Sequence, residues 1–352
     1  MNKNVLALIL FFLSNTVFLS QSSLTGKSKL SIFLEGDKQW TGIAVSKSGR
    51  MFVCFPRWTD NTPVSVGEIV NKKVIPFPDT SWNNQAATKN ANNKFVCVQS
   101  VSVDSSNILW VLDTGYELST DSTKSAHLYA FDLNSNSLLR DYTISSDKIS
   151  SRSYLNDLAI DKKTNNVFFS DSRVGGIVIL DLTTGKIRRV LSKHRSTLAE
   201  VNQITIEGYV RSHPVHSDGI TLDPQKKYLY YCSLMGKYVY RISTSDLLNK
   251  ELSEEQLGEK VERFAETGAN DGIAFDRSGN LYLTSLEKNG ISMIDQNGSL
   301  QVVASDHKIQ WPDSFAFDQN NDLFFTTSQI HIPIEKRGTY KIFKLRLTRR
   351  SK

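Results

Sequence analysis

One short pattern recurs six times along the chain, and it limits the folds open to this sequence more than any other feature does. Each copy has a polar residue, a small residue, an alternating apolar run, a turn rich in Asp, Ser, Gly and Asn, and a second apolar run. The first apolar residues of the copies lie 42 to 62 residues apart and are Ile43, Val101, Leu158, Ile220, Ile273 and Phe315. Such self-similarity indicates a repeat architecture, in which each unit needs its neighbours to bury its apolar faces.

Two further strand-like runs follow most copies. The third runs are 128–133, 177–182, 238–243 and 291–295, and the fourth runs are 138–144, 187–192, 261–266 and 300–305. Four strands in each of six units predict an all-β fold, a six-bladed β-propeller with four-stranded antiparallel blades. The last unit has a third run at 340–347 but no fourth, and residues 30–34 can supply it. We therefore expect one domain over residues 30–348, with its ring closed by an N-terminal strand in the last blade.

The net charge of +6 is concentrated at the C-terminal end of the chain. Eight Lys and Arg residues and no Asp or Glu lie between Lys336 and Lys352, so the other residues together carry a net charge of −2. We interpret this basic segment as mostly an edge strand of the last blade, where charges discourage pairing with other chains. We expect no nucleic-acid partner, and a content of 39% hydrophobic and 22% charged residues excludes a disordered chain and a polytopic membrane protein.

Residues 1–22 have the pattern of a secretory signal peptide, with a basic start at Lys3, an apolar run over 5–13 and small residues at Ser20 and Ser22. The apolar run is too short for a bilayer, and an uncleaved anchor extended through residues 17–19 is the alternative. No later segment has the length and hydropathy of a membrane span. We expect a secreted or periplasmic protein whose three cysteines, Cys54, Cys97 and Cys232, are buried free thiols.

The first strand of every blade lines the axis of a propeller, so the polar residue before each first strand is predicted to converge there. That column is Thr41, Gln99, Asn156, Asp218, Asp271 and Asp313, and Asn270 stands one place before its member. Asp and Asn at strand starts also cap turns, which is the structural alternative. Three carboxylates around one axis are nonetheless unfavourable unless a metal ion or an amine lies between them.

Two chemistries fit this column. Oxygen atoms of Asn156, Asp218 and Asp271 suit Ca²⁺ or another divalent cation, which polarises a lactone carbonyl for hydrolysis. The same carboxylates beside aromatic side chains such as Trp40 and Trp311 suit an amine that carries an aromatic ring. The residues alone leave both open.

Several stretches resemble the major royal jelly protein/Yellow family. They are Gly49–Trp58 with its Pro-Arg-Trp ending, Pro76–Pro78 followed by Trp82-Asn83, Leu109–Gly115, Phe168–Ser172 and Leu229–Tyr231. The resemblance covers roughly residues 30–348 and implies a secreted six-bladed propeller. In that family, some members are associated with dopachrome conversion, some bind biogenic amines, and others are nutritive.

Two details depart from that family. Its members often carry a cysteine before the strand at 109–113, where this chain has Ser105-Ser106-Asn107, so Cys97 lacks a family-type disulfide partner. The blade openings at 218–220 and 270–272 also resemble gluconolactonase/regucalcin-type propellers, which hold a divalent cation. Asn156 and Asp218 are similar to their ligands, but Thr41 stands where those proteins have Glu.

We therefore expect an exported propeller that binds a small polar or amine ligand in its axial pocket, through the column and Asn270. The alternatives are a divalent-cation-dependent lactonase and a non-catalytic scaffold. If the chain is an enzyme, lactone hydrolysis or an isomerisation of the dopachrome-conversion type is expected.

Overall fold

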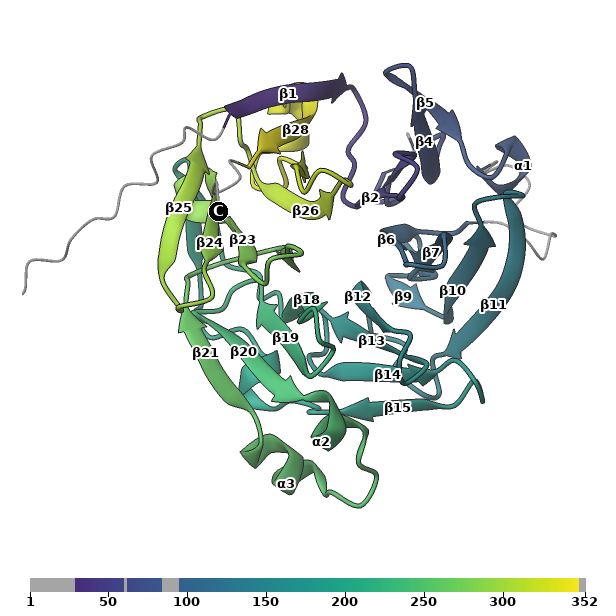
Figure 1. Cartoon of the computed structure of the whole chain (residues 1–352), viewed down its shortest axis with the longest axis vertical. Helices are drawn as coiled ribbons and strands as arrows, with labels where there is room; N and C mark the ends of the chain where they lie inside the picture. Colours follow the sequence, from purple (N-terminus) through teal and green to yellow (C-terminus); the bar gives the residue numbers. More distant parts are fainter. Residues whose placement is uncertain (1–28, 60–61, 84–94, 348–352) are drawn as a thin grey trace, which may run out of the picture.

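The computed structural model describes residues 29–59, 62–83 and 95–347, which form a ring of six β-sheets around a central axis (Figure 1). Each sheet has four strands, and neighbouring strands run antiparallel. In five sheets the first strand in sequence lies on the axial side, whereas in the sheet that contains β1 this place belongs to β26 and β1 lies at the outer edge. These features confirm the predicted six-bladed propeller, whereas the predicted signal peptide at 1–22 lies outside the described residues.

From the axis outward, each blade contains four strands. Blades 1 and 2 consist of β2 (Ile43–Val45), β3 (Met51–Cys54), β4 (Val66–Val70) and β5 (Lys73–Pro76), then β6 (Val98–Val103), β7 (Ile108–Asp113), β10 (Ser125–Asp132) and β11 (Ser137–Ser145). Blades 3 and 4 consist of β12 (Leu155–Asp161), β13 (Asn166–Asp171), β14 (Ile177–Asp181) and β15 (Ile187–Val190), then β18 (Ser217–Leu222), β19 (Tyr228–Ser233), β20 (Tyr238–Ser243) and β21 (Glu262–Glu266). Blades 5 and 6 consist of β22 (Ile273–Phe275), β23 (Leu281–Ser285), β24 (Gly290–Ile294) and β25 (Leu300–Ser305), then β26 (Pro312–Phe317), β27 (Leu323–Thr327), β28 (Tyr340–Arg346) and β1 (Lys29–Gly36).

The remaining elements are short insertions that the repeat did not predict. They are the hairpins β8 (Tyr116–Glu117) with β9 (Ser122–Thr123) and β16 (Ile204–Ile206) with β17 (Tyr209–Arg211), the helices α1 (Thr80–Asn83), α2 (Thr244–Leu248) and α3 (Glu254–Glu259), and the 3₁₀ turns η2 (Arg195–Thr197), η3 (Leu286–Lys288) and η4 (Ile334–Lys336). Helix α3 begins with a capping box, in which Ser253 and Gln256 exchange side-chain and backbone hydrogen bonds. Among the described residues, no helix has the length and apolar character needed to cross a membrane.

The ring closes as the sequence predicts. Strand β1 pairs antiparallel with β28, from Lys29 opposite Arg346 to Gly36 opposite Tyr340, so the two ends of the described chain share one blade (Figure 1). On the axial side of the same junction, the Thr326 hydroxyl donates a hydrogen bond of 2.5 Å to the Thr41 carbonyl of blade 1. The ring is therefore closed by the pairing of β1 with β28 inside blade 6 and by a hydrogen bond between blades 6 and 1.

The hydrophobic core lies between neighbouring blades. Phe52 of blade 1 packs in one cluster with Phe131 of blade 2, and Trp110 of blade 2 packs with Phe169 of blade 3. The other four blade interfaces are built in the same way. Because successive strand residues point to opposite faces, a blade with a neighbour on each side is apolar on both faces. This explains the nearly continuous apolar runs that marked the repeat in the sequence.

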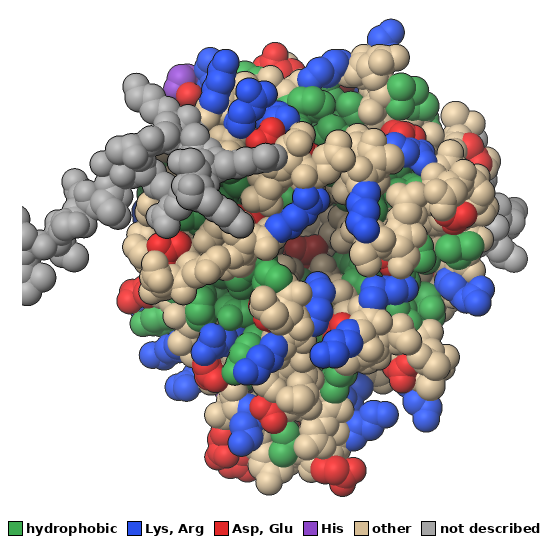
Figure 2. All heavy atoms as spheres, in the orientation of Figure 1, with side chains coloured by type: hydrophobic (Ala, Val, Ile, Leu, Met, Phe, Trp, Pro, Cys, Tyr) green, Lys and Arg blue, Asp and Glu red, His purple; other side chains and the backbone are tan. Residues whose placement is uncertain are grey.

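The basic C-terminal segment needs one correction. Strand β28 is the third strand of its blade, and β1 is the edge strand, so the charges of β28 do not protect an open edge. They form ion pairs inside the blade instead, since Lys344 lies 2.9 Å from Asp322 and Lys341 lies 3.6 Å from Glu35. On the face drawn in Figure 2, Lys and Arg side chains surround a central hollow and alternate with Asp and Glu further out.

Candidate functional site

A cavity of about 350 Å³ opens on the axis, at the rim where the first strands of the blades begin. Of the column predicted from the sequence, Gln99, Asn156, Asp218, Asp271 and Asp313 line it. Five consecutive blades thus each contribute one side chain to the cavity. The remaining lining residues come from loops at the same rim, chiefly after the second strands and before the first strands.

A glycine after the axial residue allows this convergence in two of the blades. A Cβ atom at Gly219 would lie 2.2 Å from the Asp271 carbonyl oxygen of the next blade, and one at Gly272 would lie 2.1 Å from the Asp313 carbonyl oxygen. Only a residue without a side chain permits so close an approach of two backbones. The recurring Asp-Gly pair therefore brings three acidic side chains together at the axis.

The two axial amides form a directional chain of hydrogen bonds that ends on an acid. The Tyr154 hydroxyl donates to Gln99 Oε1 over 2.8 Å, and Gln99 Nε2 donates to Asn156 Oδ1 over 3.0 Å. Asn156 Nδ2 then donates to Asp218 Oδ2 over 2.9 Å. This chain fixes the orientation of both amides and directs an N–H group toward the acidic cluster.

The three axial carboxyl groups hold protons at pH values where an exposed aspartate is fully ionised. Burial and the charges of Asp271 and Asp313 raise the pKa of Asp218 well above its ordinary value of 3.8. Burial raises the pKa of Asp271 to about 7, although hydrogen bonds with Trp311 and Asp218 lower it. Burial and the charge of Asp271 also raise the pKa of Asp313 well above 3.8. Because like charges in one desolvated site oppose each other, the cluster needs either protons or a cation to be stable.

Two of the predicted residues lie outside the cavity lining. The Thr41 side chain is buried and donates a hydrogen bond of 2.8 Å to the Gln99 carbonyl, so it joins blade 1 to blade 2. Asn270 turns its Nδ2 to Thr267 Oγ1 over 2.7 Å and to the Gly268 carbonyl over 2.6 Å. Both side chains are engaged with neighbouring loops or strands.

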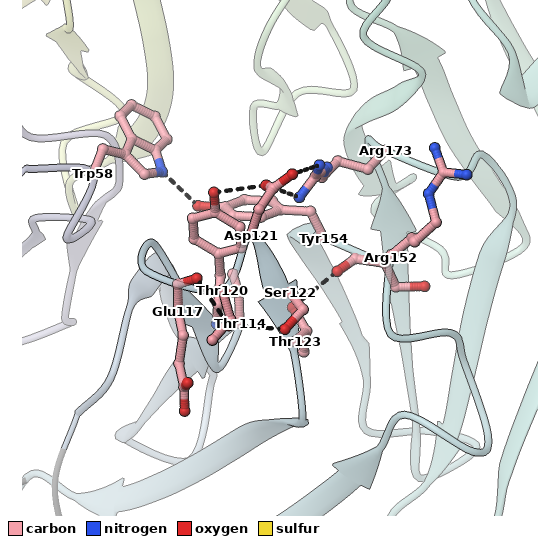
Figure 3. Close-up of polar contacts among 12 residues, drawn as sticks. Trp58, Thr114, Glu117, Thr120, Asp121, Ser122, Thr123, Arg152, Tyr154 and Arg173 are labelled. Atoms are coloured by element: carbon pink, nitrogen blue, oxygen red, sulfur yellow. Dashed lines mark hydrogen bonds and ion pairs between the residues drawn. The ribbon is translucent and has the colours of Figure 1, made fainter. Parts of the chain in front are cut away.

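Aromatic side chains line the cavity together with the acids. Trp58, Tyr116, Tyr154 and Trp311 line it, and Trp58 Nε1 donates to the Tyr154 hydroxyl over 2.8 Å (Figure 3). Trp58 belongs to a family motif from which no role could be assigned, and neither tyrosine was among the predicted site residues. Arg57 of the same motif has a structural role, because it donates hydrogen bonds to the backbone carbonyls of Phe95 and Asn83.

The segment 116–123, which contains the β8–β9 hairpin of blade 2, and a loop of blade 3 contribute Asp121 and Arg173 to the cavity lining. Asp121 in the hairpin accepts hydrogen bonds from Arg173 over 2.9 and 3.2 Å and from the Tyr116 hydroxyl over 2.9 Å. Figure 3 shows Asp121 and Arg173 directed toward each other. The charge of Arg173 is therefore already balanced within the protein.

Arg211 is a lining residue that no sequence pattern predicted. It ends β17, and its guanidinium carbon lies 5.4 Å from the centre of the Trp311 ring. Trp311 Nε1 in turn donates to Asp271 Oδ2 over 2.6 Å. Burial lowers the pKa of Arg211, whereas the charges of Asp271 and Asp218 raise it. No periodic signal could reveal Arg211, because it comes from a hairpin inserted between blades 3 and 4.

The residues predicted to bind a divalent cation lie together, but their side-chain atoms are not arranged as ligands of a metal ion. Asn156 presents an N–H group to Asp218, and Asp271 already accepts from Trp311. Asn156 Oδ1, Asp218 Oδ2 and Asp271 Oδ2 each already accept a hydrogen bond, whereas Ca²⁺ takes six to eight oxygen ligands. Across residues 29–59, 62–83 and 95–347, no three His, Cys, Asp or Glu side chains form a group that suits a metal ion. We derive no step through a metal, and the cation stays a prediction that metal addition tests.

The three cysteines are buried and free, as expected. Burial raises the pKa of the Cys54 thiol to about 12 and that of the Cys97 thiol to about 11. Burial also raises the pKa of the Cys232 thiol well above its ordinary value. These thiols are structural, since a nucleophilic cysteine needs a lowered pKa and access to its substrate.

Sequence comparison identifies relatives among the major royal jelly proteins and the Yellow proteins. The profile of the family described as "Major royal jelly protein" matches residues 96–352. Major royal jelly protein 7 of Apis mellifera is 25% identical over 59% of this chain and 49% of its own length. Protein yellow of Drosophila melanogaster is 26% identical over 70% of this chain and 48% of its own length. The chain thus spans about half the length of these curated relatives.

Solved structures with the same fold are more distant in sequence. A gluconolactonase from Xanthomonas campestris superposes with a TM-score of 0.57 at 14% identity, covering 92% of this chain and 91% of that one. A luciferin-regenerating enzyme superposes with a TM-score of 0.58 at 12% identity, covering 90% of this chain and 95% of that one. At such identities the likeness supports the propeller fold alone.

Proposed function

Since this chain belongs to the major royal jelly protein family, whose profile matches most of it, we propose that its axial pocket binds a small organic cation that carries an aromatic ring. The proposal concerns the pocket of this chain, and it rests on the chemistry of the lining residues. Function on a propeller fold is decided by the site and not by the fold.

The observation that supports this proposal is a cluster of three buried acids in a cavity that aromatic side chains also line. Asp218, Asp271 and Asp313 are buried at the axis and together hold protons to balance their charge. An ammonium group placed among them replaces those protons and makes charge-assisted hydrogen bonds, each worth about 1.5–3 kcal/mol. An aromatic face near the ammonium adds about 0.5–2 kcal/mol.

The size and the charge of the cavity agree with a ligand of this kind. A volume of about 350 Å³ lies at the lower end of the range of small-molecule pockets, about 300–1,000 Å³. Among its lining residues, Arg173 is paired with Asp121, so the three axial carboxyls outnumber the one remaining guanidinium, that of Arg211. The site therefore keeps an excess of acidic groups for a cation.

Titration calorimetry with tyramine and with p-cresol tests the proposal, because the two share a ring and only tyramine carries an ammonium. We expect tyramine to bind and p-cresol to bind far more weakly. Asp271→Asn should weaken tyramine binding at least about tenfold, as expected when one charged hydrogen-bond partner is lost. Asp37→Asn, at a side chain that is 86% exposed, is the control. Equal binding of both compounds, or an unchanged tyramine affinity in Asp271→Asn, would refute the proposal.

The lactonase alternative is tested on the same protein by adding Ca²⁺ and following the hydrolysis of gluconolactone. Hydrolysis that needs the metal and is lost in Asp218→Asn would favour the alternative. If neither amines nor lactones interact with the protein, the non-catalytic scaffold is favoured.

We also propose that the chain is exported and that residues 1–22 are removed. The support is the sequence pattern of that segment, with its basic start and its apolar run. N-terminal sequencing of the mature protein from the producing cell tests this. A mature chain that begins at Met1 would contradict it.

A further inference from the structure

Arg211 is a partly buried guanidinium without a partner of opposite charge in direct contact. Its Nε atom is buried and unpaired, and the Arg211 side chain forms no hydrogen bond or ion pair with any residue that the structure describes. Three other arginines near the cavity, in contrast, have acceptors for their terminal nitrogens, although Arg57 Nε is also buried and unpaired. Arg173 pairs with Asp121, Arg189 pairs with Asp171 over 2.8 Å, and Arg57 donates to backbone carbonyls. A buried N–H group of a guanidinium that lacks an acceptor is unfavourable, because it loses hydration without gaining a hydrogen bond.

Trp311 holds Arg211 close to Asp271, one of the three axial acids. The guanidinium lies over one face of the indole, while the indole N–H group donates to Asp271. Stacking of this kind leaves the in-plane N–H groups of the guanidinium free to donate. Arg211 also lies close enough to Asp271 and Asp218 for their charges to act on it. The pocket therefore places free N–H groups of Arg211 near the carboxyl groups of Asp271 and Asp218.

We propose that the pocket is built for zwitterions, namely α-amino acids with an aromatic side chain, and that it prefers them to simple amines. The ammonium group lies among Asp218, Asp271 and Asp313, and the carboxylate accepts a forked pair of hydrogen bonds from Arg211. The ring packs against the aromatic wall, which includes Trp58 and Tyr154. This inference rests on the proposed function, because it assigns the ammonium group to the same three acids. It adds the recognition of a carboxylate.

The two charges of an α-amino acid are separated by one carbon atom, so their partners must lie side by side. Arg211 and Asp271 meet this requirement through Trp311, which contacts both. Arg173 does not supply the carboxylate site, since both of its terminal nitrogens already donate to Asp121. The carboxylate contact is thus assigned to one residue and can be removed by one substitution.

Calorimetry with three ligands tests the assignment. L-Tyrosine carries both charged groups, tyramine lacks the carboxylate, and 3-(4-hydroxyphenyl)propionate lacks the ammonium. We expect L-tyrosine to bind about 10- to 100-fold more tightly than tyramine, the ratio that a charge-assisted forked contact provides. Arg211→Gln should abolish this ratio and retain tyramine binding, which also shows that the variant is folded. Arg211→Lys keeps the charge without the fork and should give an intermediate ratio.

The outcomes separate this inference from the proposed function. If the wild-type protein binds tyramine as tightly as L-tyrosine, or if Arg211→Gln weakens both equally, the carboxylate assignment is overturned and amine binding stands. If 3-(4-hydroxyphenyl)propionate binds through Arg211 and tyramine does not bind, the proposed function is overturned and the carboxylate site is supported. If none of the three ligands binds, both are overturned.

Discussion

Replacing Asp271 with asparagine should make the folded protein more stable at neutral pH while leaving its stability near pH 4 almost unchanged. The reason is that the folded state raises the pKa of this carboxyl group from 3.8 to about 7. Between those two values the folded state binds a proton that the unfolded chain has released. The free energy of unfolding of the wild-type protein therefore falls as the pH rises through this window.

The size of the effect follows from the shift. Each pKa unit corresponds to about 1.4 kcal/mol, so a shift of roughly three units lowers the free energy of unfolding by about 4 kcal/mol between pH 4 and pH 7. Asparagine at this position keeps an oxygen that accepts the hydrogen bond from Trp311, and it has no proton to lose. The variant should therefore lose most of this contribution, while Asp218 and Asp313 continue to make their own.

Urea unfolding followed by tryptophan fluorescence at a series of pH values from 4 to 8 measures this. The Asp271→Asn curve should diverge upward from the wild-type curve as the pH rises. The exposed control Asp37→Asn should follow the wild type throughout. If Asp271→Asn loses as much stability between pH 4 and pH 8 as the wild type does, so that the two curves are parallel, the reasoning is refuted. The same gain in stability should be accompanied by weaker tyramine binding, because the charge that destabilises the empty pocket is the one that holds the ligand.

Three other substitutions or treatments have defined outcomes. A thiol reagent should modify Cys54, Cys97 and Cys232 only after denaturation, since all three are buried with raised pKa values, and fast modification of the native protein would contradict the structure. Gly272→Ala should lower the free energy of unfolding by about 1–3 kcal/mol, because its Cβ would lie 2.1 Å from the Asp313 carbonyl, whereas Gly338→Ala, with open space around it, should not. Tyr154→Phe should lower it by about 1–3 kcal/mol through loss of the hydroxyl that links Trp58 to Gln99, and an unchanged melting temperature would argue against this buried link.

The fold was accessible from the sequence because its evidence is local and repeated. Each blade interface buries apolar residues from both blades, so most strands appear in the sequence as apolar runs. One such run is weak evidence for a strand, but the same pattern in six copies indicates a repeat. Ring closure was predictable because the last copy lacked one strand and the N-terminal segment supplied one. The column of axial residues followed from the same repeat, and five of its six members line one cavity.

What the tertiary structure alone decided lies in the segments that break the repeat. Arg211 and Tyr116 enter the pocket from inserted hairpins whose length and direction follow no period. Thr41 obeys the pattern, yet its hydroxyl turns to a carbonyl of the next blade. The repulsion among the three axial acids followed from the predicted column, but their desolvation, and with it their protonation, arises only when the blades meet around one axis. The sequence by itself therefore determined the ring and the position of its acidic rim, whereas the charge state and the selectivity of the pocket depend on side chains that only the folded ring brings together.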